Sequence, residues 1–276
     1  MQFGYSAGAP VIDNLSMSID AGSIVGIVGP SGCGKSTVLS LVSGLLSPTG
    51  GRIERRLDGS ERHPLSMVFQ KDTLLPWLSA AGNISLFTRF KANRKHRFTQ
   101  VSADGQAEGG SQEEELAAHV SSLLRLAKLT DYAEAFPYQL SGGMRRRLAF
   151  LVAVASHPQI LLLDEPFSAV DEPTRVGIHE DVFRIAKMMK ITTVLVTHDL
   201  AEAITLCDRV FILSNRPARV AQEYKIPFGT ERRMLEIRER PDFLELYGHL
   251  WHDLSIQISH SQGNGARLPG PAGTLN

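Results

Sequence analysis

The chain has 276 residues, of which 43% are hydrophobic and 21% charged, and its 29 basic side chains balance its 29 acidic ones. This composition supplies enough apolar material for a packed core and excludes an intrinsically disordered chain, while the zero net charge argues against a general nucleic-acid binder. No apolar run reaches the roughly 18 residues of a membrane-spanning helix, and Cys33 and Cys207 make no disulfide framework, which fits a reducing cytosol.

Short apolar runs rich in β-branched residues predict buried strands at 23–28, 66–69, 160–163, 192–196 and 209–213. A glycine-rich turn follows the first run, and a helical pattern then continues until Gly44. A second helix is predicted over 174–190, where one apolar face carries Ile178, Val182, Ile185 and Met189. This alternation predicts an α/β fold with a largely parallel sheet and helices packed on it.

Helical periodicity replaces the strand signal between about 74 and 142, and we interpret this stretch as an inserted helical subdomain. Ser111 and Glu114 form a capping-box pattern. The apolar face of the helix that follows consists of Leu116, Val120, Leu123, Leu124 and Ala127. The polar segment 103–111 is expected to be a solvated loop, and the basic run 94–97 is interpreted as solvated rather than as a contact with lipid.

Residues 29–37 read GPSGCGKST, which matches G-x-x-x-x-G-K-[ST] between a predicted strand and a predicted helix. The candidate phosphate-binding residues are Gly29, Pro30, Ser31, Gly32, Cys33, Gly34, Lys35, Ser36 and Thr37. Glycines let backbone N–H groups approach phosphate oxygens, and the helix N-terminus favours negative charge. We expect Lys35 to reach the β- and γ-phosphates of a nucleotide and Ser36 to ligate Mg²⁺. Cys33 is interpreted as a small filler of the loop rather than a redox switch.

Two carboxylates, Asp164 and Glu165, end the predicted strand at 160–163. Asp164 is placed to hold Mg²⁺, directly or through water. Glu165 follows it and is a candidate general base that polarises the attacking water. The alternative, a strand that merely ends in surface acids, is disfavoured by the phosphate loop upstream.

A third motif, Ser141-Gly142-Gly143, stands at a predicted helix start shortly before the Asp-Glu pair. Few nucleotide-binding proteins combine these elements, and from about residue 11 to 213 the chain resembles the ATP-binding subunit of an ABC transporter. The motifs that carry the resemblance are, in order, the phosphate loop, Gln70, Ser141 to Gly143, Asp164 with Glu165, Asp171 in a D-loop-like segment and His198 in Thr-His-Asp.

The resemblance implies a P-loop NTPase with a mainly parallel sheet, an N-terminal antiparallel β part and the inserted helical subdomain. It also implies a head-to-tail homodimer with two ATP molecules, each held between one chain's phosphate loop and the other chain's Ser141, Gly142, Gly143 and Asp171. Ser141 itself is expected to cap a helix whose glycine-rich N-terminus is a phosphate-binding surface.

Four residues are candidate catalytic residues under this resemblance: Lys35, Gln70, Glu165 and His198. Gln70 is also a candidate Mg²⁺ ligand, and His198 is expected to contact the γ-phosphate. Tyr5, or alternatively Phe3, lies where the family stacks a ring on adenine. The alternatives are a polar strand end for Gln70 and a helix-capping neighbour of Asp199 for His198.

A narrower similarity, to the nitrate/sulfonate/taurine import group, rests on 71–78 (KDTLLPWL), Met144 and 215–220 (NRPARV). It implies an ATP-binding domain at 1–225, a C-terminal helical extension at 226–255 and a disordered tail at 256–276. An apolar pattern in the extension includes Phe243, Leu246, Leu250 and Trp251. The sequence departs from the family pattern at Val152, where an arginine is usual, and at Val170, where a leucine is usual.

The implied function is an ATPase that couples hydrolysis to solute import at the cytoplasmic face of the inner membrane. Its implied partners are two permease subunits and, indirectly, a solute-binding protein, with no nucleic acid. The competing functions are a soluble ABC-type ATPase not linked to transport and a regulatory nucleotide-binding module. The apolar segment 74–77 is interpreted either as core packing or as the lining of a groove for a permease helix.

Overall fold

The computed structural model describes residues 1–5, 10–57, 64–71, 73–92, 112–168 and 170–263. A six-stranded sheet forms its centre, with the strands in the order β2-β3-β4-β1-β5-β6. The strands are β1 Ile24–Val28, β2 Leu65–Val68, β3 Ile160–Asp164, β4 Thr192–Val196, β5 Arg209–Leu213 and β6 Val220–Lys225. All neighbours are parallel except β5 and β6.

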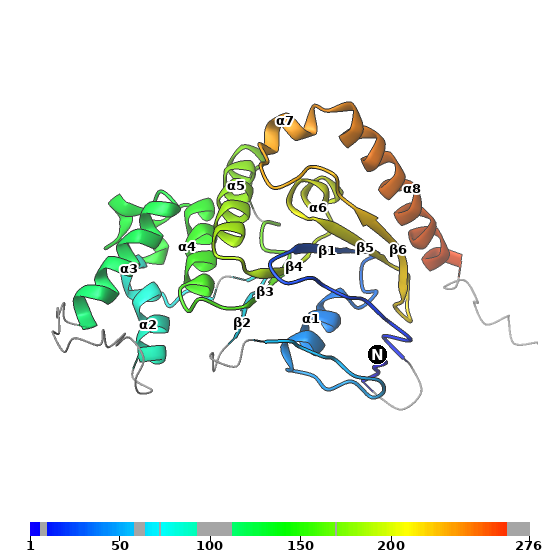
Figure 1. The fold of residues 1–276 in the computed structure, drawn as a ribbon, viewed down its shortest axis with the longest axis horizontal. Coiled ribbons are helices and arrows are strands. Elements are labelled where there is room, and N and C mark those ends of the chain that lie inside the picture. Colours follow the sequence, from blue (N-terminus) through cyan, green and yellow to red (C-terminus); the bar gives the residue numbers. More distant parts are fainter. Residues whose placement is uncertain (6–9, 58–63, 72, 93–111, 169, 264–276) are drawn as a thin grey trace, which may run out of the picture.

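Helices cover both faces of this sheet (Figure 1). They are α1 Lys35–Ser43, α2 Ala80–Ala92, α3 Gln112–Leu126, α4 Gly142–Val154, α5 Glu172–Met188, α6 Leu200–Leu206, α7 Met234–Arg238 and α8 Pro241–Gly263, with 3₁₀ turns η1 Thr130–Tyr132 and η2 Pro137–Gln139. Both the predicted α/β class and the predicted end of the first helix at Gly44 are confirmed.

Alternate residues along each strand enter different cores, because successive side chains of a strand point to opposite faces. In β3, Leu161 and Leu163 pack in one core cluster with residues of α4, α5 and α6, whereas Leu162 packs in the other with Val38 and Leu39 of α1. Figure 1 shows α1 on one side of the sheet and α6, α7 and α8 on the other. The sheet is thus buried on both faces, as the continuous apolar runs predict.

Within 74–142, the described residues form helices and turns and no strand. The predicted apolar face of α3 is buried at Val120, Leu123, Leu124 and Ala127, with Leu116 half-buried. The predicted capping residue Ser111, the loop 103–111 and the basic run 94–97 lie outside the described residues. None of the described helices combines the length and the hydrophobicity needed to cross a bilayer.

The predicted N-terminal antiparallel part is present, but as bridges rather than as continuous strands. Near the N-terminus, the described residues make only isolated bridges, among them Gln2 with Gly50 and Phe3 with Ile12. The continuous antiparallel pair is β5 with β6, and β6 was not predicted, because 220–225 has only half-buried and exposed residues and lacks an apolar run. An edge strand with one face exposed carries little of the signal of a buried strand.

The C-terminal extension also differs from the expectation. Helix α8 continues to Gly263, past the predicted start of the tail at 256, because Ile258 packs on the core and the Ser255 and Ser259 hydroxyls donate to carbonyls one turn earlier. Residues 264–276 lie outside the described part. Leu250 is fully buried, but Trp251, predicted on the same face, is 53% exposed because it lies about 100° further around the helix.

Candidate nucleotide-binding site

The loop between β1 and α1 folds as a tight cradle at the N-terminus of α1. Gly34 precedes α1 with φ of 122°, a backbone conformation that favours glycine, and a Cβ there would stand 3.1 Å from Val11 Cγ1. Cys33 is fully buried, and burial raises the pKa of its thiol. A buried neutral thiol is unreactive, which favours the interpretation of Cys33 as a filler.

Lys35 is folded back into this loop. Its side chain is largely buried, and Nζ donates to the carbonyl oxygens of Gly29 at 2.9 Å and Pro30 at 3.0 Å. The ammonium group is therefore held at the centre of the loop, beside the backbone N–H groups at the start of α1.

The start of α1 is joined to the end of β3 by Ser36, whose hydroxyl donates to Oδ1 of Asp164 at 3.1 Å. Burial raises the pKa of Asp164, opposed by the hydrogen bond from Ser36; the charge of Glu165 raises it further, and that of Lys35 lowers it. The described residues contain no group of three His, Cys, Asp or Glu side chains placed to hold a metal. One carboxylate and one hydroxyl fit Mg²⁺, which usually retains waters and binds substrate phosphates.

The carboxylate of Glu165 contacts side chains from the loops that follow the two neighbouring strands. Its Oε2 accepts a hydrogen bond from Gln70 Nε2 at 3.3 Å and lies 3.3 Å from His198 Nδ1. Gln70 follows β2, Glu165 follows β3 and His198 follows β4, so the three come from the carboxyl ends of adjacent parallel strands. Open α/β sheets bind ligands at this edge.

The backbone at Glu165 adopts φ of +45°, which is uncommon for a non-glycine residue. Its N–H donates to the carbonyl of Val196 at 2.9 Å, and its own carbonyl accepts from the Ser168 hydroxyl at 3.2 Å. The unfavourable conformation is thus held by hydrogen bonds from both sides. Such conformations cluster at functional sites.

Three arginines that sequence reasoning missed support these loops. Arg146 of α4 donates to the carbonyl of Gln70 at 2.6 Å, and Arg216 donates to the carbonyl of Gly32 at 2.7 Å. Arg175 of α5 donates to the carbonyl of Val170 at 2.9 Å and to Asp199 Oδ2 at 3.2 Å. Sequence periodicity does not predict these hydrogen bonds, because the partners of each arginine are distant along the chain or belong to another element.

Tyr5 lies beside the start of α1. Its hydroxyl is 3.2 Å from Oγ1 of Thr37, its ring contacts Phe3 edge-to-face, and the side chain is 66% exposed. The exposed ring therefore adjoins the last residue of the phosphate loop, where an aromatic face is accessible to a ligand.

Ser141, Gly142, Gly143 and Asp171 stand apart from this cluster. Ser141 caps α4, as predicted, because its Oγ accepts from the N–H of Met144 at 3.3 Å. Among the described residues, no hydrogen bond or ion pair joins 141–143 to the phosphate loop. A Cβ at Gly142 would meet nothing within 4 Å, so the start of α4 is open.

Asp171 caps α5. Its side chain accepts from the N–H of Thr174, and hydrogen bonds from the side chain and then the backbone of Thr174 lower the pKa of the carboxylate. A Cβ at Gly143 would stand 2.3 Å from Thr174 Cγ2, so the starts of α4 and α5 pack closely enough to require glycine. The Ser-Gly-Gly turn and Asp171 are thereby held near each other.

The apolar segment after Gln70 is held by a buried side chain that sequence reasoning missed. Asn83, 1% exposed, accepts from the N–H of Leu75 at 2.8 Å and donates to the carbonyls of Leu75 and Leu78. Leu74 and Leu75 are half-buried, and Trp77 is 69% exposed. This ordered turn therefore presents a large aromatic ring to solvent.

Comparison with known proteins gives one family and several close relatives. The model of the family described as ABC transporter matches residues 12–168. The taurine import ATP-binding protein TauB of Jannaschia sp. (strain CCS1) is 34% identical over 271 residues, covering 94% of this chain and 93% of the relative. The nitrate import ATP-binding protein NrtD of Synechococcus elongatus is 38% identical over 240 residues, covering 85% and 81%.

A solved structure has the same fold. It is a dimer of the ATP-binding cassette MJ0796 in a post-hydrolysis state, bound to ADP and Pi. It is 30% identical, with a TM-score of 0.62, and the similarity covers 82% of this chain and 95% of that one.

Proposed function

The chain belongs to the ABC transporter family, and we propose that it is the ATP-hydrolysing subunit of an import system that couples ATP hydrolysis to solute uptake through a membrane permease. The observation that carries the proposal is the meeting of Gln70, Glu165 and His198 at the sheet edge that also holds Lys35 and Asp164. A module that only bound a nucleotide would need neither Glu165 nor His198.

In the proposed reaction, the phosphate loop and Lys35 hold the β- and γ-phosphates of ATP. Ser36, Asp164 and Gln70 are the candidate ligands of Mg²⁺, which neutralises phosphate charge when it is bound. Glu165 takes a proton from the attacking water as a general base, and His198 orients the γ-phosphate and that water. The hydrogen-bond partners of Glu165 hold its carboxylate in place before the nucleotide arrives.

Two chains are proposed to share each ATP in a head-to-tail homodimer. The open start of α4 supports this, because a glycine-rich helix N-terminus favours an anion and space for one is free beside Gly142. The dimeric MJ0796 cassette with ADP and Pi is a relative that assembles in pairs. Tyr5 is proposed to stack on adenine and Asp171 to contact the nucleotide across the dimer.

The membrane partners are proposed to be two permease subunits at the cytoplasmic face of the inner membrane, with a solute-binding protein as an indirect partner. The similarity to import subunits for taurine and nitrate supports a solute of the nitrate/sulfonate/taurine type. A soluble ABC-type ATPase unconnected with transport is less favoured, because these relatives are import subunits and the similarity to this chain covers most of their length.

Two measurements test this function. Phosphate release from ATP by the purified chain should require Mg²⁺ and should be lost in Lys35→Ala, while the exposed Lys225→Ala serves as a control. Tagged chain should co-purify with the permease made alongside it. A chain that hydrolyses ATP but co-purifies with no membrane protein would instead support the soluble alternative.

A further inference from the structure

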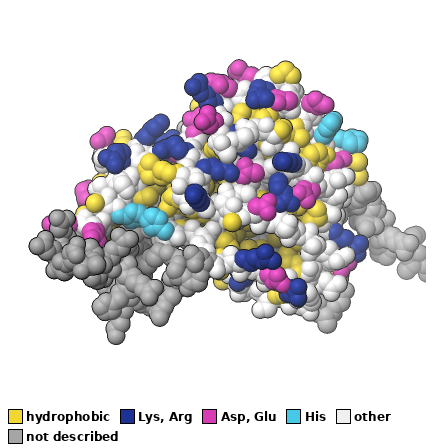
Figure 2. Space-filling model, in the orientation of Figure 1, with side chains coloured by type: hydrophobic (Ala, Val, Ile, Leu, Met, Phe, Trp, Pro, Cys, Tyr) yellow, Lys and Arg dark blue, Asp and Glu magenta, His cyan; other side chains and the backbone are white. Residues whose placement is uncertain are grey.

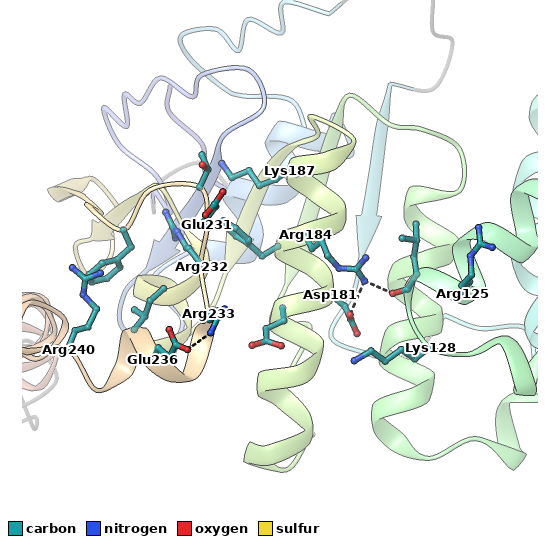
Figure 3. A pocket seen from close by; sticks show the side chains of 16 residues that line it. Arg125, Lys128, Asp181, Arg184, Lys187, Glu231, Arg232, Arg233, Glu236 and Arg240 are labelled. Carbon is teal, nitrogen blue, oxygen red and sulfur yellow. Dashed lines mark hydrogen bonds and ion pairs between the residues drawn. The ribbon is translucent and has the colours of Figure 1, made fainter.

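A groove of about 1210 Å³ lies among the end of α3, helix α5 and residues 228–240 (Figure 3). None of the candidate nucleotide-binding residues lines it. Its base is α5, one wall is the C-terminal end of α3, and the opposite wall is the segment that leads into and includes α7. The groove thus joins the inserted helical region to the C-terminal extension.

The lining of this groove is positively charged, although the whole chain has no net charge. Of its sixteen lining residues, seven are Lys or Arg and four are Asp or Glu. The cations are Arg125, Lys128, Arg184, Lys187, Arg232, Arg233 and Arg240. Figure 2 shows Lys and Arg side chains, mixed with Asp and Glu, across the visible face of the molecule.

Two carboxylates, Asp208 behind the lining and Asp181 within it, each bind two cations, and Lys187, Arg232 and Arg184 among these cations line the groove. Lys187 and Arg232 both bind Asp208, at 2.6 Å and 3.1 Å. Arg147 and Arg184 both lie 3.2 Å from Asp181. One carboxylate balances one cation, so each cluster keeps excess positive charge in a partly buried place, where charges are less screened than at an open surface.

The two walls carry further cations. Arg125 and Lys128 are exposed at the end of α3, and no ion pair to either is found among the described residues. Facing them across α5, Arg233 has a side chain that is 80% exposed, and its ion-pair partner among the described residues is Glu236 one turn away, at 2.8 Å. An exposed local pair of this kind is weak and can be exchanged for a ligand.

We propose that this groove binds a small polyanion that carries at least two separated phosphate, sulfonate or carboxylate groups. Because Arg125 and Lys128 lie on one side of α5 and Arg233 on the other, a ligand with two separated anionic groups can contact both walls, and the volume suits a small molecule rather than one ion. A long acidic peptide fits less well, because it would pass the exposed carboxylates of Glu180 and Glu231 in the same lining. None of the lining residues belongs to the candidate nucleotide site.

Binding would connect segments far apart in the sequence. A ligand that contacts Arg125 or Lys128 on one wall and Arg233 on the other links α3 to the C-terminal extension through its own anionic groups. Ligands that bind only the folded state raise its stability, so the melting temperature of the full chain should rise with ligand concentration.

The test uses inositol hexakisphosphate as the probe and calorimetric titration of the Lys35→Ala chain in EDTA, which removes the contribution of the phosphate loop and metal. The matched variants are Arg125→Glu with Lys128→Glu in the groove, and Arg52→Glu with Lys225→Glu on exposed surface outside it. Both pairs change the net charge equally. We expect the groove pair to weaken binding at least tenfold, or about 1.4 kcal/mol, and the outer pair to weaken it much less.

Equal weakening by the two pairs would overturn the proposal, because it would mean attraction by overall charge. Absence of saturable binding would overturn it as well. A poly-glutamate peptide is titrated in parallel. If the peptide alone bound, with the same dependence on Arg125 and Lys128, the groove would be a docking surface for an acidic protein segment and the small-ligand proposal would be wrong.

Discussion

Oε2 of Glu165 lies 3.3 Å from Nδ1 of His198. The same oxygen accepts the hydrogen bond from Gln70, so two loops converge on one carboxylate oxygen whose own backbone is held at φ of +45°. This convergence leaves the second oxygen, Oε1, without a contact from either of these two residues. A general base needs one oxygen available to the water it deprotonates.

The first prediction is that Glu165→Gln removes the base while keeping the shape of the side chain. Turnover should fall by roughly 10²–10⁴-fold, the usual loss for a general base, because an amide cannot take the proton of the attacking water. ATP binding should persist, since Lys35 and the loop are untouched. Phosphate release measures turnover, and Glu180→Gln on the exposed face of α5 is the matched control. Unchanged turnover in Glu165→Gln would refute the assigned role.

A second prediction concerns the shared site. Ser141→Arg places bulk and charge at the open start of α4, where the partner chain's γ-phosphate is proposed to lie. The monomer should still bind ATP through Lys35, but the ATP-dependent dimer should be absent in size-exclusion chromatography. Ser141→Ala, which removes only the cap, should lose about 1 kcal/mol of stability and still dimerise. A Ser141→Arg chain that dimerised with ATP would contradict the head-to-tail arrangement.

The site residues that could be predicted from the sequence are those in contiguous motifs. The phosphate loop needs its glycines, lysine and hydroxyls next to one another, and Asp164 and Glu165 follow directly from an apolar strand. Their mutual contacts could be expected because parallel strands end at one edge. Arg175 could not be predicted, since its function depends on carbonyl and carboxylate partners that only the packing of α5 against the loop after β4 provides.

The same division applies to the fold. The five predicted strands agree with the structure within a residue or two, because a short uninterrupted apolar run is typical of a strand that is buried on both faces of a sheet. Edge strand β6 and the end of α8 were missed. β6 is an edge strand with only half-buried and exposed residues, and the end of α8 packs on the core with one side only, so the apolar pattern is weak in both places.

A third prediction assigns Arg175 a positioning role. Its guanidinium joins the Val170 carbonyl to Asp199, which caps α6 directly after His198. In Arg175→Ala, both loops lose this link, and turnover should fall about tenfold, or ~1.4 kcal/mol, with the KM for ATP nearly unchanged. Arg175→Lys should restore only part of the lost turnover, because the lysine ammonium lacks the planar set of N–H donors with which a guanidinium binds two acceptors. A raised KM with normal turnover would contradict this role.

A fourth prediction uses the contact of β6 with α8. Tyr224 donates to Asp253 Oδ2 at 2.5 Å, and burial together with this hydrogen bond raises the pKa of Tyr224 to about 12. An unfolded tyrosine ionises near pH 10. Between pH 10 and 12 the unfolded chain therefore binds fewer protons than the folded chain, so stability falls as pH rises.

Urea unfolding at pH 9 and near pH 11.5 checks this sign. Tyr224→Phe should reduce the loss of stability between the two pH values, while Tyr138→Phe, which removes an exposed hydroxyl, should not. An equal loss in the parent and in Tyr224→Phe would mean that Tyr224 does not contribute to the pH dependence.

The last prediction concerns the permease contact. Trp77 is exposed on a turn that Asn83 holds through three backbone groups, so its ring is presented without the entropy cost of ordering a loose loop. An exposed tryptophan on an ordered turn that follows Gln70 in the sequence is the kind of residue that anchors an interface. Leu74 and Leu75 are half-buried, so a substitution there would change folding as well as binding. Trp77 is exposed, so a substitution there tests binding alone.

Trp77→Asp should therefore abolish co-purification with the permease, while ATP binding and the melting temperature of the isolated chain stay nearly unchanged. Asn83→Ala is the contrasting variant: it leaves buried backbone groups of the turn without their partner and should cost about 1–3 kcal/mol of stability. If Trp77→Asp unfolded the isolated chain, its ring would be part of the core. If it folded and still bound the permease, the docking surface would lie elsewhere, because the charge would have entered no interface.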